Sequence, residues 1–375
     1  MTRAKPYILA LVIALIVGAI YFINLNGVKK TGSDQAVTVA PRVTSESGGT
    51  ASSPPTEINK DAMPSKFLSA EAKSKQYELA KEITTPDGFI NTEGESITVN
   101  ELVGKKVILI DFWTYSCINC QRTTPYLNAW YEKYKDKGFV IIGVHTPEFQ
   151  FEKDYNNVKT AVEKFGIKFP VVLDNDYSTW IAYKNQYWPR KYLIDIDGYV
   201  VYDHIGEGAC EETEKKIQEA LSERMAVLGE SGVISQPLTK EISVQNGAKS
   251  PEIYFGSARN DQQRNLLSPN DGWDIRPEFA QNNSANASIV YTYTARDVFF
   301  VAESDTETVV EVLRDGKPIG AEAGTDIIKT SDGRSVLKIK EARLYKIIQS
   351  KQSETHTLEL RIEKPGLRAF TFTFG

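Results

Sequence analysis

The sequence predicts an α/β domain with a mixed sheet and helices on both faces, followed by an all-β sandwich and preceded by one transmembrane helix. Three observations support this prediction. An uncharged apolar run occupies residues 7–25, strand and helix patterns alternate from about 83 to 228, and short alternating strands fill 251–375. The chain of 375 residues is long enough for two or three domains. Its hydrophobic fraction of 41% and charged fraction of 25% are ordinary for folded proteins.

Net charge and cysteine content exclude some function classes. The formal net charge is −5, whereas a nucleic-acid partner requires a basic face, so we expect none. Three cysteines are too few for a scaffold held together by disulfides. A close pair among them is therefore expected to be redox-active or metal-binding.

The apolar run at residues 7–25 is about as long as a helix that crosses a bilayer. Arg3 and Lys5 precede it, and Lys29 and Lys30 follow it, which favours a cytoplasmic N-terminus and an exported body. The bulky stretch YFINLNG does not resemble a cleavage site. We therefore expect an uncleaved signal anchor over residues 1–30, with a cleaved signal peptide as the alternative. The predicted location is the cell membrane, as a single-pass protein with its soluble domains outside the cytoplasm.

Residues 31–65 are rich in Ser, Thr, Gly and Pro, which predicts a flexible linker. The α/β domain is expected over 66–228, beginning with a lead-in helix at 69–83. Alternation of buried runs and amphipathic segments then predicts strands at 105–113, 139–146 and 169–176, with helices at 119–138, 151–167 and 211–228. A β-hairpin turning at Asp197-Gly198 is expected within 191–205.

A linker is expected over 229–250, and the pattern changes after it. No helix of convincing length is predicted in 251–375, where Gly, Asp and Asn separate short alternating strands. Six strands are expected, at 287–295, 297–304, 308–320, 335–349, 355–366 and 368–375. This domain is expected to be a sandwich of the jelly-roll or galactose-binding-like kind, similar to carbohydrate-binding modules.

The stretch DFWTYSCINCQRTTP at 111–125 concentrates the reactive chemistry. Its strand ends at Trp113 and delivers Cys117 to the start of a helix, where free N–H groups and the helix dipole stabilise a thiolate. Cys120 lies three residues on and can resolve a mixed disulfide on Cys117. Asp111 lies beneath the pair on the strand, and burial there would raise its pKa, which suits proton transfer. The alternative is that Asp111 is a strand-end residue that only caps neighbouring backbone groups. Pro125 should bend the helix because it removes one backbone hydrogen bond.

These residues resemble the thioredoxin superfamily, in its membrane-tethered extracytoplasmic branch of TlpA-like reductases and the C-terminal region of DipZ proteins. Asp111, Phe112, Trp113, Cys117, Cys120 and Pro125 match at the family's spacing, and the likeness covers about residues 83–228. WTYSCINCQRTTPYL, HTPEF and the final FTFG are most similar to DipZ proteins. Those proteins also carry a multi-helix membrane domain that supplies electrons, so the electron donor here is open.

The resemblance also implies a cis proline facing the cysteine pair, and the matching residue is Pro189 in NQYWPRKYLID. Its role would be to shape the groove in which a peptide docks; an ordinary trans proline entering a strand is the alternative. Glu148 in HTPEF resembles an acid found near the pair in this branch, with a solvated loop carboxylate as the alternative. Trp113 and Tyr115 flank the pair as packing residues or substrate contacts.

Other uses of the cysteine pair have weaker support. A zinc site lacks further ligands, because His145, His204 and His356 are isolated, and haem attachment would need a histidine where Gln121 stands. A structural disulfide across so short a turn would constrain little. A peroxiredoxin-like peroxidase would need a proline at position 110, which is Ile110. We expect no metal and no cofactor.

Two further hypotheses concern the rest of the chain. Trp273 in NDGWDIRPEF could stack on a sugar, which would make the chain a surface-anchored carbohydrate- or partner-binding protein; a buried core tryptophan is the favoured interpretation. Cys210, after GEGA, is expected at a helix start near the active end of the sheet. It is either inert or a third redox cysteine.

The function predicted from these residues is a thiol–disulfide oxidoreductase. Cys117 attacks, Cys120 resolves, Asp111 transfers protons, and Pro189 shapes the docking groove. Ile118 and Asn119 between the thiols carry no positive charge, which favours a reductant over an oxidant. The partners are exported protein disulfides and an unidentified electron donor.

Overall fold

The computed structural model describes residues 67–237, 248–259 and 265–375. Within these ranges no helix is both long and apolar enough to span a bilayer. Three predictions fall on residues outside the described ranges. They are the anchor at 7–25, the linker at 31–65, and positions 238–247 of the linker expected at 229–250.

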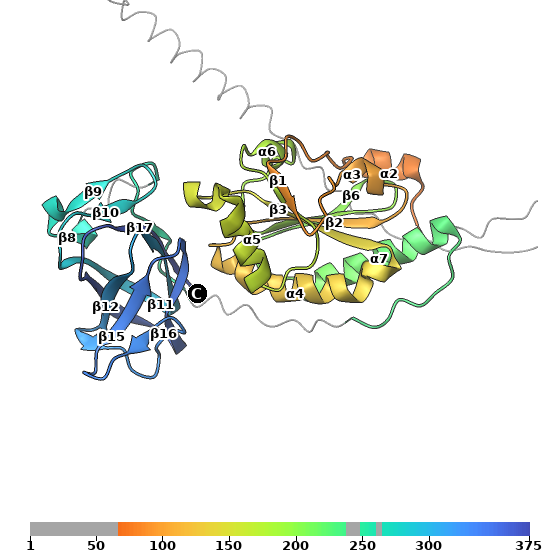
Figure 1. Ribbon diagram of the computed structural model, residues 1–375. Helices are drawn as coiled ribbons and strands as arrows, with labels where there is room; N and C mark the ends of the chain where they lie inside the picture. The colour runs from red at the N-terminus through yellow and green to blue at the C-terminus, as the bar shows by residue number, and fades with distance from the viewer. Residues whose placement is uncertain (1–66, 238–247, 260–264) are drawn as a thin grey trace, which may run out of the picture. The chain divides into compact units, whose positions relative to one another are not determined.

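The first domain is built on a six-stranded mixed sheet in the order β1-β4-β3-β2-β5-β6 (Figure 1). The pairs β2–β3 and β3–β4 are parallel, whereas the two edges of the sheet are antiparallel. The strands are β1 (Gly88–Ile90), β2 (Val107–Trp113), β3 (Phe139–His145), β4 (Val171–Leu173), β5 (Arg190–Ile194) and β6 (Val200–Ile205). The helices are α2 (Ala70–Gln76), α3 (Val99–Leu102), α4 (Ile118–Tyr134), α5 (Tyr155–Lys164), α6 (Ser178–Ala182) and α7 (Cys210–Leu228), with 3-10 turns η1 (Lys135–Lys137) and η2 (Gln150–Lys153).

Strand β2 is buried along its whole length because both faces of the sheet are covered. Helices α4, α5 and α7 lie on one face, and α3 and α6 lie on the other. Side chains alternate along a strand, so Leu109 and Trp113 pack on the α4 side while Ile108 and Phe112 pack on the opposite side. Asp111 occupies the α4 side between Leu109 and Trp113 along the strand, and its register partner on β5 is Lys191.

The predicted strand–helix alternation of this domain is confirmed, with differences at element ends. The lead-in helix expected at 69–83 begins after its cap Ser69, as predicted, but ends at Gln76. The chain then runs extended, and Leu79 forms a bridge with Tyr199. The helix expected at 151–167 begins only at Tyr155, because the Asp154 carboxylate accepts hydrogen bonds from the next backbone N–H groups. Strand β1 and helices α3 and α6 were not predicted, since each has five residues or fewer.

The hairpin predicted within 191–205 is confirmed. Strands β5 and β6 pair in antiparallel register, and the turn closes through a hydrogen bond from Gly198 N to Asp195 O of 3.1 Å. Gly198 has φ of 90°, a backbone conformation that favours glycine.

The second domain is all-β, as predicted. Its strands form one antiparallel sheet of eleven strands, whose main path runs β14-β15-β12-β16-β11-β17-β10-β9. The strands are β7 (Ile253–Tyr254), β8 (Leu267–Ser268), β9 (Trp273–Ile275), β10 (Ala280–Asn282), β11 (Ala287–Ser304), β12 (Thr308–Arg314), β13 (Lys317–Pro318), β14 (Ile328–Lys329), β15 (Ser335–Ile339), β16 (Arg343–Ile362) and β17 (Leu367–Phe374), with η4 (Asn270–Gly272).

Several predicted strand boundaries in this domain are wrong. The segments expected as separate strands at 287–295 and 297–304 are one strand, β11. Its register with β16 shifts between Ala295 and Asp297, so a bulge replaces the expected turn and the ladder continues through it. Conversely, the segment at 335–349 divides between β15 and β16, and β16 continues into the segment expected as a separate strand at 355–366. The segment at 308–320 divides between β12 and β13.

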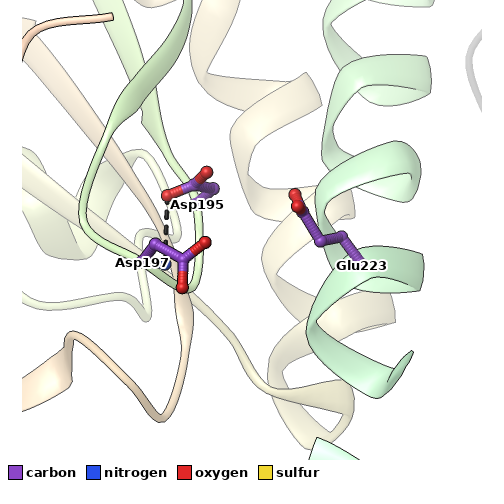
Figure 2. Close-up of side chains that lie close together, drawn as sticks. All are labelled: Asp195, Asp197 and Glu223. Atoms are coloured by element: carbon purple, nitrogen blue, oxygen red, sulfur yellow. Dashed lines mark hydrogen bonds between the residues drawn. The ribbon is translucent and has the colours of Figure 1, made fainter. Parts of the chain in front are cut away.

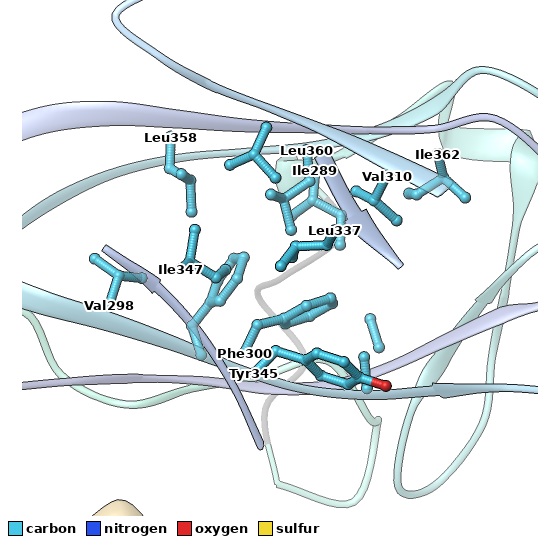
Figure 3. Packing of buried hydrophobic residues seen from close by; sticks show 14 of the residues in the cluster. Ile289, Val298, Phe300, Val310, Leu337, Tyr345, Ile347, Leu358, Leu360 and Ile362 are labelled. Atoms are coloured by element: carbon cyan, nitrogen blue, oxygen red, sulfur yellow. The ribbon is translucent and has the colours of Figure 1, made fainter. Parts of the chain in front are cut away.

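A large apolar core fills the second domain. In Figure 3, side chains from the first half of β11 and the second half of β16, such as Ile289 and Leu360, point toward Phe300 and Tyr345 from the other halves of these strands. The side chain of Trp273 is 7% exposed and belongs to this core, which confirms the favoured interpretation of this residue.

Candidate functional site

Cys117 is the N-cap residue of α4 rather than a member of its first turn. Its backbone is extended, with φ of −77° and ψ of 120°, and its Sγ accepts a hydrogen bond from the backbone N of Cys120 at 3.4 Å. A sulfur in this position replaces the serine or aspartate that usually satisfies the free N–H groups of a helix start. The helix end therefore stabilises negative charge on the Cys117 sulfur.

The two thiols differ in exposure. Cys117 is partly exposed, whereas Cys120 is 2% exposed. Burial raises the pKa of the Cys120 thiol well above its ordinary value, and the neighbouring Cys117 and Asp111 raise it further. Both cysteines are free thiols. The arrangement places one accessible sulfur beside one that stays protonated until a base removes its proton.

Asp111 lies beneath this pair and is 2% exposed. Burial raises the pKa of its carboxyl group to about 7, although the charge of Lys191 acts in the opposite direction. Its Oδ1 has no hydrogen-bond partner among the described residues. A carboxyl group with this pKa exchanges protons near neutral pH, which is the property expected from the sequence.

Lys191 is a site residue that the sequence analysis missed. It stands opposite Asp111 in the β2–β5 register and is fully buried, and its Nζ donates to Gly206 O at 3.3 Å. A lysine two residues after a proline in a strand is usually exposed, so its sequence context gave no signal. Its ammonium offsets part of the cost of ionising the buried Asp111.

The bond between Trp188 and Pro189 is cis, as the resemblance implied. The carbonyl oxygen of Trp188 lies 3.9 Å from Cys117 Sγ, so this backbone borders the nucleophile. Gly206 N donates to Pro189 O at 2.8 Å, which brings the loop before Cys210 to the same end of the sheet. This confirms the predicted placement of that loop.

Cys210 is the first residue of α7, and its side chain is 5% exposed. Its Sγ donates to Gly208 O at 3.6 Å. A thiol buried to this extent cannot meet a docked chain without movement of the surrounding loop.

The flanking residues of the sequence prediction have other surroundings. The Trp113 side chain is buried, and its ring packs edge-on against His145 with centroids 5.0 Å apart, so packing is the role that the structure favours. Burial lowers the pKa of His145 to about 3, which keeps its ring neutral. The Glu148 carboxylate contacts Arg259 and accepts a hydrogen bond from the Tyr254 hydroxyl at 2.9 Å. Glu148 is thus not a solvated loop carboxylate, and its hydrogen-bond and ion-pair partners in the described part of the chain do not include the thiols.

A cluster of three acids lies apart from the cysteine pair. In this cluster, Asp195 and Asp197 of the hairpin face Glu223 of α7 (Figure 2). Lys73 of α2 supplies the cation at its centre. Its Nζ lies 2.5, 2.6 and 2.7 Å from carboxylate oxygens of Asp195, Asp197 and Glu223. Burial lowers the pKa of Lys73, but the three acids together raise it above the ordinary value. The cluster is therefore an internal ion network that joins α2 to the hairpin and α7.

Two family models and several known proteins match parts of this chain. Residues 75–235 match the family model described as Redoxin, and residues 249–375 match the one described as Thioredoxin like C-terminal domain. Protein DipZ of Mycobacterium tuberculosis is 36% identical over 322 residues, covering 78% of this chain and 43% of DipZ. The chain thus spans less than half the length of that relative.

Two shorter relatives correspond to the first domain. Thiol-disulfide oxidoreductase ResA of Bacillus thuringiensis is 38% identical over 122 residues, which cover 32% of this chain and 67% of ResA. The solved thioredoxin domain of a thiol-disulfide oxidoreductase from Bacteroides vulgatus is 30% identical with a TM-score of 0.31, covering 37% of this chain and 96% of that one. The chain belongs to the thioredoxin-like family of thiol–disulfide oxidoreductases.

Proposed function

We propose that this protein is a membrane-anchored reductant of disulfides in exported proteins. The observation that carries the proposal is the asymmetric thiol pair at the start of α4. One sulfur is partly exposed at the N-cap, and the other is buried above a carboxyl group with a pKa of about 7.

In the proposed reaction the Cys117 thiolate attacks one sulfur of a substrate disulfide. A bond forms between that sulfur and Cys117 Sγ, the substrate S–S bond breaks, and the first substrate thiolate leaves and takes up a proton. The Asp111 carboxylate then accepts the proton of Cys120, whose sulfur attacks Cys117 Sγ. The bond between Cys117 and the substrate sulfur breaks, and Asp111 passes its proton to the leaving substrate thiolate. Two electrons and two protons pass to the substrate, and the enzyme is left with a Cys117–Cys120 disulfide.

The proposed direction follows from the energetics of the reduced state. A strong oxidant owes its high potential to a reduced form in which the thiolate is stabilised. The thiolate concerned here is that of Cys117, and neither Ile118 nor Asn119 adds a positive charge that would stabilise it beyond the effect of the helix end. The reduced form therefore lacks strong stabilisation, which favours reduction of substrates. A separate dithiol donor must return the enzyme to its reduced form.

Pro189 and the carbonyl of Trp188 are proposed to border the groove in which the substrate chain docks, because they lie beside Cys117. Anchoring is supported by the apolar run at 7–25 and by its flanking lysines and arginine. We also assign the second domain to the jelly-roll type of sandwich, supported by the core that both halves of β11 and β16 share. No described aromatic residue of that domain is exposed, and Trp273 is buried, so no observation favours sugar binding.

Equilibration of the purified protein with glutathione or dithiothreitol tests the direction. We expect a potential nearer that of thioredoxin, about −270 mV, than that of a strong oxidant, about −120 mV. A value above about −150 mV would contradict a reductant. In parallel, Cys120→Ser should trap substrates as mixed disulfides on Cys117, whereas Cys117→Ser should trap none.

A further inference from the structure

A buried carboxylate outside the cysteine motif contacts the residue that precedes the nucleophile. Glu152 of η2 is fully buried, and one of its oxygens accepts hydrogen bonds from the Ser116 backbone N at 3.2 Å and the Ser116 hydroxyl at 2.6 Å. Its other oxygen accepts from the backbone N of Glu148 at 2.5 Å and of Phe149 at 3.0 Å. A single side chain thus joins two separate loops.

The topology explains why these loops meet. Ser116 lies in the connection from β2 to α4, and Glu152 lies in the connection from β3 to α5. Strands β2 and β3 are parallel neighbours that end together, with Trp113 opposite His145. Loops that leave the carboxyl ends of adjacent parallel strands emerge at the same edge of a sheet, where active sites of such folds form.

The partners of Glu152 match an ionised carboxylate. Three of its four hydrogen bonds come from backbone N–H groups, which can only donate. Only the Ser116 hydroxyl could reverse and accept. Burial raises the pKa of Glu152 to about 7 and the nearby Glu148 raises it as well, while the hydrogen bonds act against both effects.

We propose that Glu152 is a positioning residue for the thiol–disulfide reaction: by holding Ser116, its carboxylate fixes the backbone that places the Cys117 sulfur on the start of α4. The inference rests on the proposed role of Cys117 as the nucleophile. Its physical basis is that the hydrogen bond from Cys120 N to Cys117 Sγ depends on the extended backbone at Cys117, one residue after Ser116.

Other ionisable groups surround Glu152. Glu148 lies in the same segment and pairs with Arg259. Burial raises the pKa of Tyr115 and raises that of Tyr177 to about 12, and the charge of Glu152 contributes a smaller part of both shifts. Among the described residues, none of these neighbouring groups forms a hydrogen bond with Ser116; its side-chain partner is Glu152.

The test is the pH dependence of Cys117 alkylation by iodoacetamide in the reduced full chain, read by mass spectrometry of the Cys117 peptide. We expect Glu152→Gln to move the midpoint of this profile upward by about one pH unit, which slows alkylation about tenfold below the midpoint. If Glu152 acted only as a nearby negative charge, its removal would instead move the midpoint downward, because an anion disfavours a thiolate. The sign of the shift therefore separates positioning from simple electrostatics.

Two further variants complete the test. Ser116→Ala changes no charge and removes one of the four hydrogen bonds, so its midpoint should move upward by a smaller amount. Glu163→Gln alters an exposed glutamate of α5 and should leave the profile unchanged. An unchanged or lowered midpoint in folded Glu152→Gln overturns the proposal, and if that variant does not fold, an unchanged midpoint in Ser116→Ala overturns it. A wild-type Cys117 that resists alkylation at every pH would instead refute its role as nucleophile.

Discussion

Asp111 is a buried polar residue in an otherwise apolar strand, and its burial affects both the stability of the fold and its proposed chemistry. It replaces a hydrophobic side chain on the α4 face of β2, where Leu109 and Trp113 are its neighbours. Burial of a carboxyl group without full hydrogen bonding is unfavourable, and the raised pKa is the result. The same burial keeps the proton available at neutral pH, so the cost to stability and the proposed function have one cause.

Asp111→Asn should slow resolution by Cys120 more than attack by Cys117. Asparagine cannot accept the Cys120 proton, whereas Cys117 lies on the helix end and does not depend on Asp111 in the proposed mechanism. We expect release of the second substrate thiol to slow about a hundredfold in single-turnover measurements. Equal slowing of both steps would show that Asp111 acts on the site as a whole rather than on Cys120.

The same residue predicts how stability depends on pH. Asp111 titrates near pH 7 when folded and near its ordinary pKa of 3.8 when unfolded, so the folded state holds a proton that the unfolded state loses between these values. The wild-type free energy of unfolding should therefore lose about 4 kcal/mol from this group as pH rises from about 4 to 8. Asp111→Asn should remove this loss in urea titrations across that range. Asp136→Asn, at an exposed site, is the matched control.

Among individual residues, sequence reasoning found those with a distinctive spacing and missed those that act through burial. Cys117, Cys120 and Asp111 were identified from the cysteine spacing and the preceding strand, and Pro189 was identified from the family resemblance. The structure places these residues together. Lys191 and Glu152 were missed because a charged residue is expected at the surface, and only the tertiary fold buries it. No local pattern distinguishes Glu152 from the exposed Glu163 eleven residues later.

Among elements, α2 is short for an independent helix, since it has seven residues and isolated helices need about 12–15. Its attachment comes from Lys73, which reaches the hairpin and α7. The prediction of a helix at 69–83 rested on helical spacing and on Ser69 at its start. It overestimated the length because the residues after Gln76 turn extended, with Leu79 bridged to Tyr199.

Lys73→Met should destabilise the first domain by about 3–5 kcal/mol at pH 7, because it leaves three acids close together without their cation. The loss should shrink at pH 4–5, because burial raises the pKa of Glu223 and its protonation relieves part of the repulsion. Urea denaturation followed by circular dichroism measures both values. Lys75→Met on the same helix removes only an exposed pair with Glu71 and should change stability by less than about 1 kcal/mol. Equal effects of the two substitutions would contradict the role of the buried network.

At the scale of the molecule, the two-part α/β and all-β organisation was predictable because side-chain periodicity changes between the domains. Strand boundaries in the second domain were less predictable. The ladder of β11 continues through a bulge near Arg296, where the sequence alternation breaks as it would at a turn. Long strands with bulges and pairs of short strands share this local pattern, and only the partner strand β16 distinguishes them.

The membrane topology is a property of the whole chain, and the burial of the cysteines makes it measurable. Cys120 and Cys210 are 2% and 5% exposed, so a thiol reagent that cannot cross membranes should label folded, reduced protein at Cys117 alone. If the segment at 7–25 anchors the chain with its N-terminus in the cytoplasm, intact reduced cells should be labelled as fully as lysed cells. Cys117→Ser should abolish the signal and Cys210→Ser should preserve it. Labelling that appears only after lysis would place the thiols in the cytoplasm and overturn the proposed role in reducing exported proteins.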